Sequence, residues 1–335
     1  MGRVDELRAT LARMAARQVE VHVGTESDGA GASCRVLTIQ LYQGWSVRVL
    51  LDRGADLGSA WYQGIPIAWT SPIGERPPLA NPMGLDWLSA FGGGLVTTCG
   101  LRNVGAPSEG HGLHGRYSHE RARLIEVEPR EASIDKVTVK TSVDEHGGPG
   151  SHLNLVRTLE AWAGEGRLEL TDVTTNCGVI DEPAPLLYHV NLGYPLVSEA
   201  AEIIVGDATR VQRAPIPRDA ASKAQLDQAR RPGPPEPSVP EAVFEHTIEP
   251  TDGGWASAEV VNPNSRLRFR LSWDASTLPR LHQWVMRSGG WYVVALEPAN
   301  CSVRGRAHDL AAGDLPILPP GATRRTHLRL EIERV

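Results

Sequence analysis

Cysteine is scarce in this chain, and basic residues are not concentrated anywhere. Four cysteines are scattered over 335 residues without a C-x-x-C pair, so a disulfide framework is not expected. The net charge is −6 and no dense lysine and arginine block is present, which argues against nucleic acid or an anionic membrane as the main partner. The composition remains compatible with a small neutral or modestly charged ligand. We expect buried thiols at Cys34, Cys99, Cys177 and Cys301.

Long apolar runs are also missing. All apolar segments fall well short of the roughly 18 residues that a membrane-spanning helix needs, so no membrane partner is expected. The N-terminus, MGRVDELRATLARMAARQ, lacks the hydrophobic region of a signal peptide, which predicts a cytoplasmic location. The glycine clusters at 92–94 and 289–290 lack the strand, turn and helix context of a phosphate-binding loop. They therefore predict tight turns or close backbone approach.

The helical signal is confined to the N-terminus. Residues 5–17 carry Leu7, Leu11 and Met14 at spacings of four and three, and Asp5 can cap the start, which predicts a short amphipathic helix. The rest of the chain consists of short segments rich in β-branched and aromatic residues, separated by turn residues. This pattern predicts large antiparallel sheets in a sandwich or barrel. The clearest segments are CRVLTIQLYQG, WSVRVLLDRG, KVTVKTSV, RLELTDVTTNCG, RLRFRLSWD, GGWYVVALEP and THLRLEIERV.

The number of domains depends on one proline-rich stretch. Residues 213–240 hold seven prolines and almost no large apolar side chains, so they cannot form core. They are either a linker between two domains or a long surface excursion of one domain. Strands resume on both sides without a change of composition, which favours the excursion and a single domain over 1–335. In RLRFRLSWD three arginines alternate with apolar residues and should cover a solvated sheet face: Arg266, Arg268 and Arg270.

Two polar side chains interrupt the apolar segment LLYHVNLGYPL, residues 186–196. In an extended strand His189 and Asn191 point one way, while Tyr188, Val190 and Leu192 point the other. The ordinary reading is a core histidine bonded to a backbone carbonyl, or a solvent-facing side of a strand. The alternative is a functional face.

Two further segments combine titratable residues with glycine-marked surroundings. GHGLHGRYSHE contains His111, His114, Arg116 and His119, but no cysteine or carboxylate completes a recognisable metal-ligand spacing. We therefore expect no metal site. In WYVVALEPANC, strand alternation places Glu297 on the apolar face of Trp291, Val293 and Ala295. Desolvation in a pocket would raise the pKa of this carboxyl and suit it to proton transfer, whereas a paired structural glutamate is the ordinary alternative.

Four blocks of the sequence carry a resemblance to a known superfamily. GGLVTTCGLRNVGAP, GLHGR, YHVNLGYPL and ALEPAN resemble aldose 1-epimerases (galactose mutarotases), in the branch of aldose 1-epimerase-like proteins of unknown function. DRGADLGSAWYQGIPIAW, residues 52–69, is similar to that branch as well. The match runs from about residue 30 to the C-terminus and is weak in the proline-rich stretch.

The resemblance implies a galactose mutarotase-like β-supersandwich with few short helices and a concave face that binds a free sugar without a cofactor. It implies catalytic roles for His114 in GLHGR, His189 in YHVN and Glu297 in ALEP. Asn191, Arg116, Arg102 and Trp291 are the candidate sugar ligands, and Trp69 and Tyr194 are further stacking candidates. The sugar-binding aspartate of the better-known branch has no counterpart that we can place.

Interconversion of two anomers fits these residue types. The reaction removes a proton from the anomeric hydroxyl and delivers one to the ring oxygen, so a base and an acid should face each other across the sugar. On this reading Glu297 is the base, protonated His189 is the acid, and His114 holds the ring oxygen or an adjacent hydroxyl.

Two alternatives keep the same fold. The first is a related epimerase or lyase acting on an oxidised or charged sugar, whose carboxylate or phosphate would bind Arg116 and Arg102. The second is a non-catalytic carbohydrate-binding protein, which would tolerate the loss of Glu297. An exposed edge strand could also support a homodimer.

Overall fold

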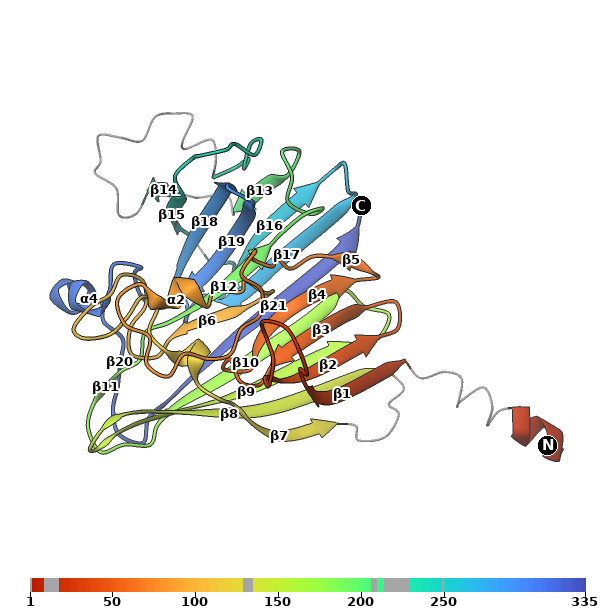
Figure 1. The fold of residues 1–335 in the computed structure, drawn as a ribbon, viewed down its shortest axis with the longest axis horizontal. Helices are drawn as coiled ribbons and strands as arrows, with labels where there is room; N and C mark the ends of the chain where they lie inside the picture. Colours follow the sequence, from red (N-terminus) through yellow and green to blue (C-terminus); the bar gives the residue numbers. More distant parts are fainter. Residues whose placement is uncertain (1, 9–17, 129–134, 206–209, 214–228, 249) are drawn as a thin grey trace.

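The computed structural model describes residues 2–8, 18–128, 135–205, 210–213, 229–248 and 250–335 (Figure 1). Helix is short in these ranges: residues 3–8, the 3₁₀ helix η1 (Tyr117–His119), α2 (Asp86–Ser89) and α4 (Arg306–Ala312). None of the helices in the described ranges is long and apolar enough to cross a membrane. Nearly all regular structure is antiparallel sheet, as the short apolar segments of the sequence predict.

The largest sheet has eight strands in the order β13-β16-β17-β21-β10-β9-β8-β7. Each named pair in it is antiparallel, and the longest strands are β8, β9 and β21. The strand bounds are β7 (Arg123–Glu128), β8 (Lys136–Gly148), β9 (Ser151–Trp162), β10 (Arg167–Asn176), β13 (Glu202–Val205), β16 (Trp255–Asn262), β17 (Leu267–Asp274) and β21 (Thr323–Arg334).

Two further sheets lie against one face of the eight-stranded sheet and share its core. One has five strands in chain order: β1 (Val19–Thr25), β2 (Arg35–Leu41), β3 (Trp45–Leu50), β4 (Asp56–Tyr62) and β5 (Ile65–Pro66). The other has six strands in the order β14-β15-β18-β19-β12-β6: β6 (Thr97–Gly100), β12 (Leu186–Leu192), β14 (Arg210–Arg213), β15 (Ala242–Thr247), β18 (Arg280–Ser288) and β19 (Trp291–Ala299). A small pair, β11 (Glu182–Pro183) and β20 (Ile317–Leu318), completes the fold.

One continuous apolar core joins the three large sheets, which makes the molecule a β-sandwich. Inward-facing side chains of β2, β9, β12 and β17 all belong to it. In β17, Leu267, Phe269 and Leu271 are fully buried, as strand alternation predicts. Because the six-stranded sheet gives only one of its faces to this core, its other face is left to carry a separate group of side chains.

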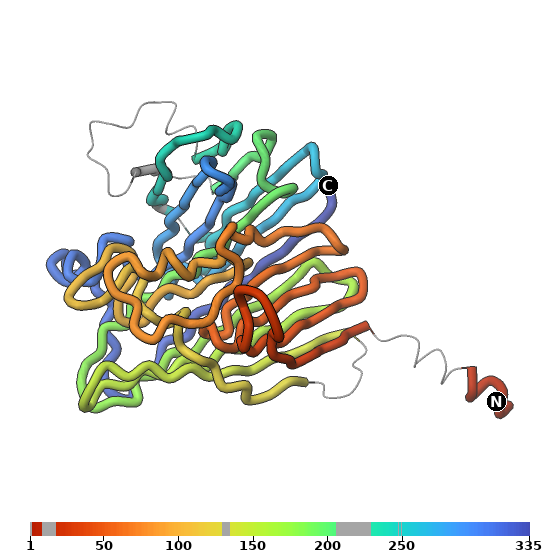
Figure 2. The backbone as a smooth tube through the Cα atoms, in the orientation of Figure 1, coloured from red at the N-terminus to blue at the C-terminus, as the bar shows by residue number. Residues whose placement is uncertain are grey.

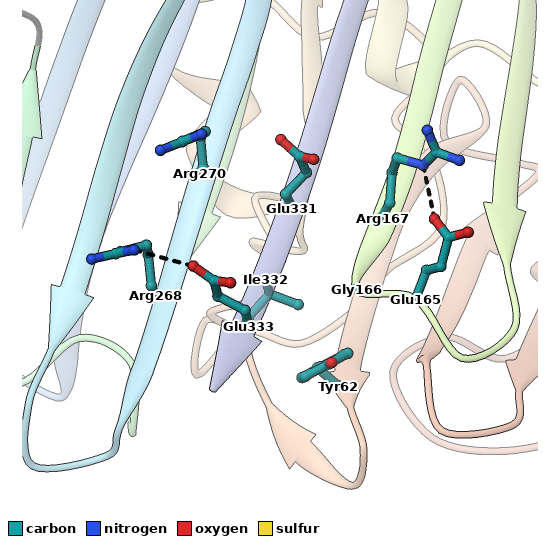
Figure 3. Close-up of a pocket in the computed structure, with 9 residues that line it drawn as sticks. All are labelled: Tyr62, Glu165, Gly166, Arg167, Arg268, Arg270, Glu331, Ile332 and Glu333. Carbon is teal, nitrogen blue, oxygen red and sulfur yellow. Dashed lines mark hydrogen bonds and ion pairs between the residues drawn. The ribbon is translucent and has the colours of Figure 1, made fainter. Parts of the chain in front are cut away.

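The outer face of the eight-stranded sheet is charged and its charges are paired. Arg268 contacts Glu259 and Glu333, and Arg270 contacts Glu259, which confirms the solvated arginine face for these two residues. Arg266 does not belong to it, because it lies in the turn before β17 with φ 56°. A groove of about 470 Å³ crosses this face, with Arg167, Glu331 and Tyr62 among its lining residues (Figure 3). Opposite charges on neighbouring strands satisfy one another there, as is typical of a solvated sheet surface.

A buried polar network ties the two layers together behind β12. The Arg157 guanidinium donates to both carboxylate oxygens of Asp172 at 3.0 and 2.7 Å, and to Thr98 on β6 at 2.8 Å. The Tyr188 hydroxyl of β12 donates to the same carboxylate at 2.7 Å. These bonds fix the position of β6 and β12, since breaking one would leave a buried charge unpaired.

Three sequence expectations need qualification. The helix expected over 5–17 is formed at 3–8, and 9–17 lie outside the described residues. The prediction of a buried thiol is wrong for Cys177, which is exposed in the turn after β10, whereas Cys34, Cys99 and Cys301 are buried. In the proline-rich stretch 214–228 lie outside the described residues, and the described part packs on the sheets: Ala229 is buried, and Tyr292 donates to the carbonyl of Gly233 at 2.6 Å.

Candidate active site

Strand β12 separates two environments. Tyr188, Val190 and Leu192 face the main core, and His189 and Asn191 face the other side of the six-stranded sheet, as the sequence predicts. β12 lies between β19 and β6 in this sheet, so both of its edges are paired. Every residue in it is buried, so both of its faces are covered as well. A histidine in such a place cannot be explained by solvent exposure.

A row of polar side chains crosses the middle of this face. His189 is opposite Thr97 of β6, and His282 of β18 is opposite Glu297 of β19. The adjoining Val190–Leu296 pair sets His189 opposite Glu297. Directly opposed residues of an antiparallel pair share a face, so Glu297 stands between two imidazoles. Glu245 of β15 follows next to His282.

His189 and Glu297 are in direct contact. The distance from His189 Nε2 to Glu297 Oε1 is 3.2 Å, with side-chain exposures of 6% and 3%. The sequence-based expectation that the two groups stand on opposite sides of a space as wide as a sugar is therefore wrong. The reason is the register of β12 against β19, which sets the two residues directly opposite each other. Their side chains therefore meet on one face of the sheet, and both would lie on the same side of a bound sugar. The ring oxygen and the anomeric oxygen of a pyranose are bonded to the same carbon, so a neighbouring acid and base can still serve both.

A loop carries His114 to the same place. The segments 67–95 and 101–116, orange to gold in Figure 2, pack on the second face of the six-stranded sheet, because Trp69, Trp87, Phe91 and Val104 share an apolar cluster with residues of that sheet. In this loop His114 has φ 56° and Gly115 has φ 69°. A β-carbon on Gly115 would lie 2.5 Å from the carbonyl oxygen of Gly100, so only glycine permits this close approach. The His114 and His189 ring centroids are 6.1 Å apart.

One hydrogen bond fixes the tautomer of His114. The backbone N–H of Gly105 donates to His114 Nδ1 at 3.3 Å, which leaves the proton of the neutral ring on Nε2. His114 keeps some contact with solvent. The protein packed around the imidazole nevertheless lowers its pKa to about 3 by desolvation, with a smaller contribution from His189. His114 is therefore a neutral donor at neutral pH.

An aromatic shell surrounds the pair, formed by Trp69, Trp87, Phe91 and Trp284. Phe91 and Trp284 lie 5.3 and 5.6 Å from the His189 ring, and Trp87 lies 6.5 Å from it. All four belong to a second apolar cluster, distinct from the main core. The shell keeps water away from His189 and Glu297, which strengthens every electrostatic interaction between them.

Burial moves the two pKa values in opposite directions. It raises the pKa of Glu297 to about 8, with a smaller contribution from the Glu241 carboxylate. It lowers the pKa of His189 to about 4, against a smaller opposite effect of hydrogen bonding with Asn191. No guanidinium or ammonium of the described chain forms an ion pair with Glu297, so nothing offsets its desolvation. Between about pH 4 and 8 the pair holds one proton, mainly on Glu297.

Asn191 supports the site through the backbone. Its Nδ2 donates to the carbonyl of Gly94 and to that of His189, both at 2.9 Å. This leaves Oδ1 as the polar atom of Asn191 that can still bind a partner, and among the described residues no well-formed hydrogen bond reaches this buried atom. Trp291 lies six residues from Glu297, about 20 Å along an extended strand. It contacts Trp69 at 5.1 Å and lines a separate groove of about 410 Å³ at the β18–β19 turn.

The two candidate arginines belong to a different charged group. Arg102 donates to Glu182 at 2.6 Å and lies 3.5 Å from Glu145. Arg116 contacts Glu120 at 3.1 Å and Glu145 at 3.4 Å. The structure therefore gathers both guanidiniums around carboxylates of the protein and does not bring them to the His189–Glu297 pair.

The other histidines of the GHGLHGRYSHE segment point elsewhere. His111 contacts Arg306 at 3.1 Å, and His119 accepts a hydrogen bond from the backbone of Leu79 at 3.2 Å. The sequence did not reveal His282, because a single histidine in a strand has no distinctive spacing. Its alternation with Trp284 in the same strand, LHQWV, is the only local sign that it shares a face with the aromatic shell.

Solved structures with the same fold include carbohydrate-related proteins. A "putative aldose 1-epimerase" from Klebsiella pneumoniae has a TM-score of 0.83 and 21% identity, over 94% of this chain and 83% of that one. A galactose mutarotase-like protein from Clostridium acetobutylicum has a TM-score of 0.66 and 12% identity, over 95% and 99%. A GalM/aldose epimerase homologue from Caenorhabditis elegans has a TM-score of 0.57 and 10% identity, over 88% and 97%.

These likenesses confirm the galactose mutarotase-like β-sandwich expected from the four sequence blocks. Identities this low establish a shared fold and leave the activity to the site itself. No curated protein matches the chain. Residues 31–332, which contain His114, His189, His282 and Glu297, match the family described as "Domain of unknown function (DUF4432)". The chain belongs to the DUF4432 family, within the aldose 1-epimerase-like fold.

Proposed function

We propose that this protein is an aldose 1-epimerase-like isomerase that interconverts the anomers of a free aldose. One observation carries the proposal: segments 75 and 108 residues apart in the chain bring His114, His189 and Glu297 to one face, where His189 and Glu297 touch at 3.2 Å. A buried carboxyl and imidazole that share one proton, and that have no other ion partner in the described part of the chain, are suited to moving protons on a neutral ligand.

The protons in the proposed reaction balance without a cofactor. His189 Nε2 takes the proton of the anomeric hydroxyl while the Glu297 carboxyl gives its proton to the ring oxygen. The bond between the anomeric carbon and the ring oxygen breaks, and an aldehyde forms. After the aldehyde rotates, the imidazolium returns its proton to the aldehyde oxygen, and the Glu297 carboxylate recovers its proton from the closing hydroxyl. The pair ends as it began.

This assignment reverses the roles that the sequence pattern suggested. With Glu297 as base and His189 as acid, both groups would have to be charged before the sugar reacts. Burial disfavours both charged forms, so the neutral pair needs no prior charge separation. Asn191 suits this form, because its Oδ1 can accept the ring N–H of His189 and leave Nε2 free. His114 Nε2–H would donate to a sugar oxygen and stabilise developing negative charge.

The aromatic shell suits a sugar ring, because flat apolar side chains can stack on its C–H faces. Trp87 and Phe91 pack closely on the pair, so a bound sugar must displace part of the shell from the sheet. His114 is the least enclosed of the three catalytic candidates, and we propose that the sugar approaches from its side. Arg102 and Arg116 are occupied by carboxylates of the protein, which favours a neutral sugar over a uronate or a sugar phosphate.

The test is anomer exchange measured by NMR, or polarimetry, on freshly dissolved sugars. The panel covers neutral hexoses, pentoses and deoxy sugars, with a uronate and a sugar phosphate as charged members. We expect at least one neutral aldose to equilibrate faster with the wild type. Glu297→Gln and His189→Asn should each lower the rate about 100-fold to 10,000-fold and keep sugar binding, measured by tryptophan fluorescence.

Glu331→Gln is the matched control, because Glu331 lies on the solvated outer face between Arg270 and Arg167 and should leave the rate unchanged. If no sugar in the panel responds, the proposed function is rejected. If sugars bind with unchanged affinity to all variants and none is interconverted, the protein is a carbohydrate-binding protein instead.

A further inference from the structure

His282 is a fully buried histidine that the proposed reaction does not use. It lies on β18 directly opposite Glu297 and shares its face of the sheet. The β-carbons of such a pair are about 4.5–5.5 Å apart, a gap that a glutamate and a histidine side chain can span together. Glu297 therefore stands between two imidazoles, with His189 on β12 and His282 on β18.

One hydrogen bond defines the protonation of His282. Its Nε2 lies 3.0 Å from the carbonyl oxygen of Cys301. A carbonyl can only accept, so Nε2 carries the proton, and Nδ1 of the neutral ring keeps its lone pair. In the described part of the chain no hydrogen bond reaches Nδ1. An unpaired buried acceptor is costly, about 1–3 kcal/mol, so its retention calls for a partner.

The neighbouring carboxyl is the group that can supply that partner. Glu297 Oε1 is buried and, among the described residues, its polar contact is the 3.2 Å approach to His189. A protonated carboxyl is a donor, and an imidazole lone pair is its natural acceptor. An ionised carboxylate facing the same lone pair would be repelled. The pairing of Glu297 with His282 is therefore favourable only while Glu297 carries its proton.

The charged groups around His282 and Glu297 do not change the conclusion that the two pair only while Glu297 is protonated. Burial lowers the pKa of His282, while the Cys301 carbonyl, Glu245 and Asp309 act to raise it and Arg280 acts to lower it. Glu245 is itself paired with Arg280 at 2.9 Å. On the side of Glu297 the facing groups are His189, Glu241 and the buried thiol of Cys99, which is kept protonated because burial and Glu297 raise its pKa. His114 approaches the row from the covering loop.

We propose that His282 is a positioning residue for Glu297: its Nδ1 accepts the carboxyl proton, directly or through one water, and so keeps Glu297 in the acid form. This inference rests on the proposed function, in which Glu297 must be a proton donor at neutral pH. In the structure Glu297 is turned toward His189. When the sugar occupies His189, His282 remains as the acceptor that holds the carboxyl in place.

Two substitutions separate the two nitrogens of His282. His282→Gln places an amide N–H where Nε2 donates to Cys301 and removes the Nδ1 acceptor, whereas His282→Asn can restore an acceptor near the position of Nδ1. The matched control is His246→Gln. His246 is also buried, its Nε2 lies 2.8 Å from Gln283, and no described residue bonds its Nδ1. It follows Glu245 in β15 and so points to the opposite face.

The first readout needs no substrate. Carbon-13 labelling of the glutamate side-chain carboxyls, with the Glu297 signal assigned by its absence from Glu297→Gln, follows the ionisation of Glu297 directly. We expect its pKa to fall by a fraction of a unit in His282→Gln, because one of the two acceptors of the carboxyl proton is lost while His189 remains. His282→Asn should recover most of this shift, and His246→Gln should show none.

The second readout is the alkaline limb of the pH profile of kcat. In the sugar complex His282 is the remaining acceptor, so losing it should lower the pKa of Glu297 by about one unit from about 8. This predicts a loss of about twofold at pH 7 and about tenfold at pH 9, with KM unchanged. An unmoved or raised Glu297 pKa in His282→Gln, with only a loss of thermal stability, would reject the inference. If the carboxyl titration shifts as expected but wild type interconverts no sugar, the proposed function fails and the placement of His282 beside the Glu297 proton stands.

Discussion

Replacing Glu297 by glutamine should stabilise the folded protein while it removes activity. The carboxyl is 3% exposed and has no cationic partner in the described chain, and burial raises its pKa from an ordinary value of 4.5 to about 8. Folding at neutral pH therefore requires the uptake of a proton from solvent. Glutamine is neutral at every pH and nearly the same size, so it avoids this requirement.

The magnitude follows from the difference between the folded and unfolded pKa values. Below pH 4.5 the carboxyl is protonated in both states, and the two proteins should be equally stable. Between pH 4.5 and 8 the unfolded chain releases the proton and the folded chain keeps it, so the stability of the wild type falls as the pH rises. At about 1.4 kcal/mol per pH unit the difference reaches about 3 kcal/mol at pH 7.

Urea unfolding of wild type and Glu297→Gln at pH 4.5, 6, 7 and 8 measures this difference. We expect the two free energies of unfolding to coincide at pH 4.5 and to separate with increasing pH, with the variant more stable. Glu331→Gln on the solvated outer face should show no such separation. A variant that is less stable than the wild type at pH 7, or a difference that does not grow with pH, would show that Glu297 is stabilised by its surroundings and would refute the reasoning.

Three further outcomes follow from the same structure. The rate of anomer exchange should fall below about pH 4, where His189 becomes protonated, and above about pH 8, where Glu297 loses its proton; a flat pH profile measured by NMR would contradict the shared-proton pair. Gly115→Ala should lower both activity and thermal stability, because a β-carbon there would lie 2.5 Å from a carbonyl oxygen at the end of β6 and φ is 69°; a normal melting temperature would show that the loop can move. Arg157→Met should cost about 3–5 kcal/mol in urea unfolding, because it leaves Asp172 buried without its cation; a loss below 1 kcal/mol would mean that this ion pair contributes little to stability.

Local sequence patterns determined the strands and their faces. The alternation in RLRFRLSWD and LLYHVNL decides which side chains enter the core, since successive residues of a strand point to opposite faces. That rule placed Leu267 and Tyr188 inside, and put His189 and Glu297 each on a face away from the main core. The four family-like blocks also indicated the fold, which the comparisons confirm.

Pairing between distant strands could not be obtained in the same way. The contact between His189 and Glu297 depends on the register of β12 against β19, and a shift of one residue would put one of them in the core. The same register sets His282 beside Glu297, although nothing in LHQWV marks it. The motif GLHGR places Arg116 close to His114 in the sequence but does not show which group the arginine contacts. In the structure Arg116 pairs with Glu145 on another strand.

The sequence by itself therefore determined which residues lie on strands, which faces they occupy and to which fold they belong, because these depend on the periodicity and composition of neighbouring positions. Only the tertiary structure decided that a carboxyl stands between two imidazoles under an aromatic shell and that the arginines are held elsewhere. The physical reason is that proton affinity depends on burial and on the nearest charges, and residues far apart in the chain supply both.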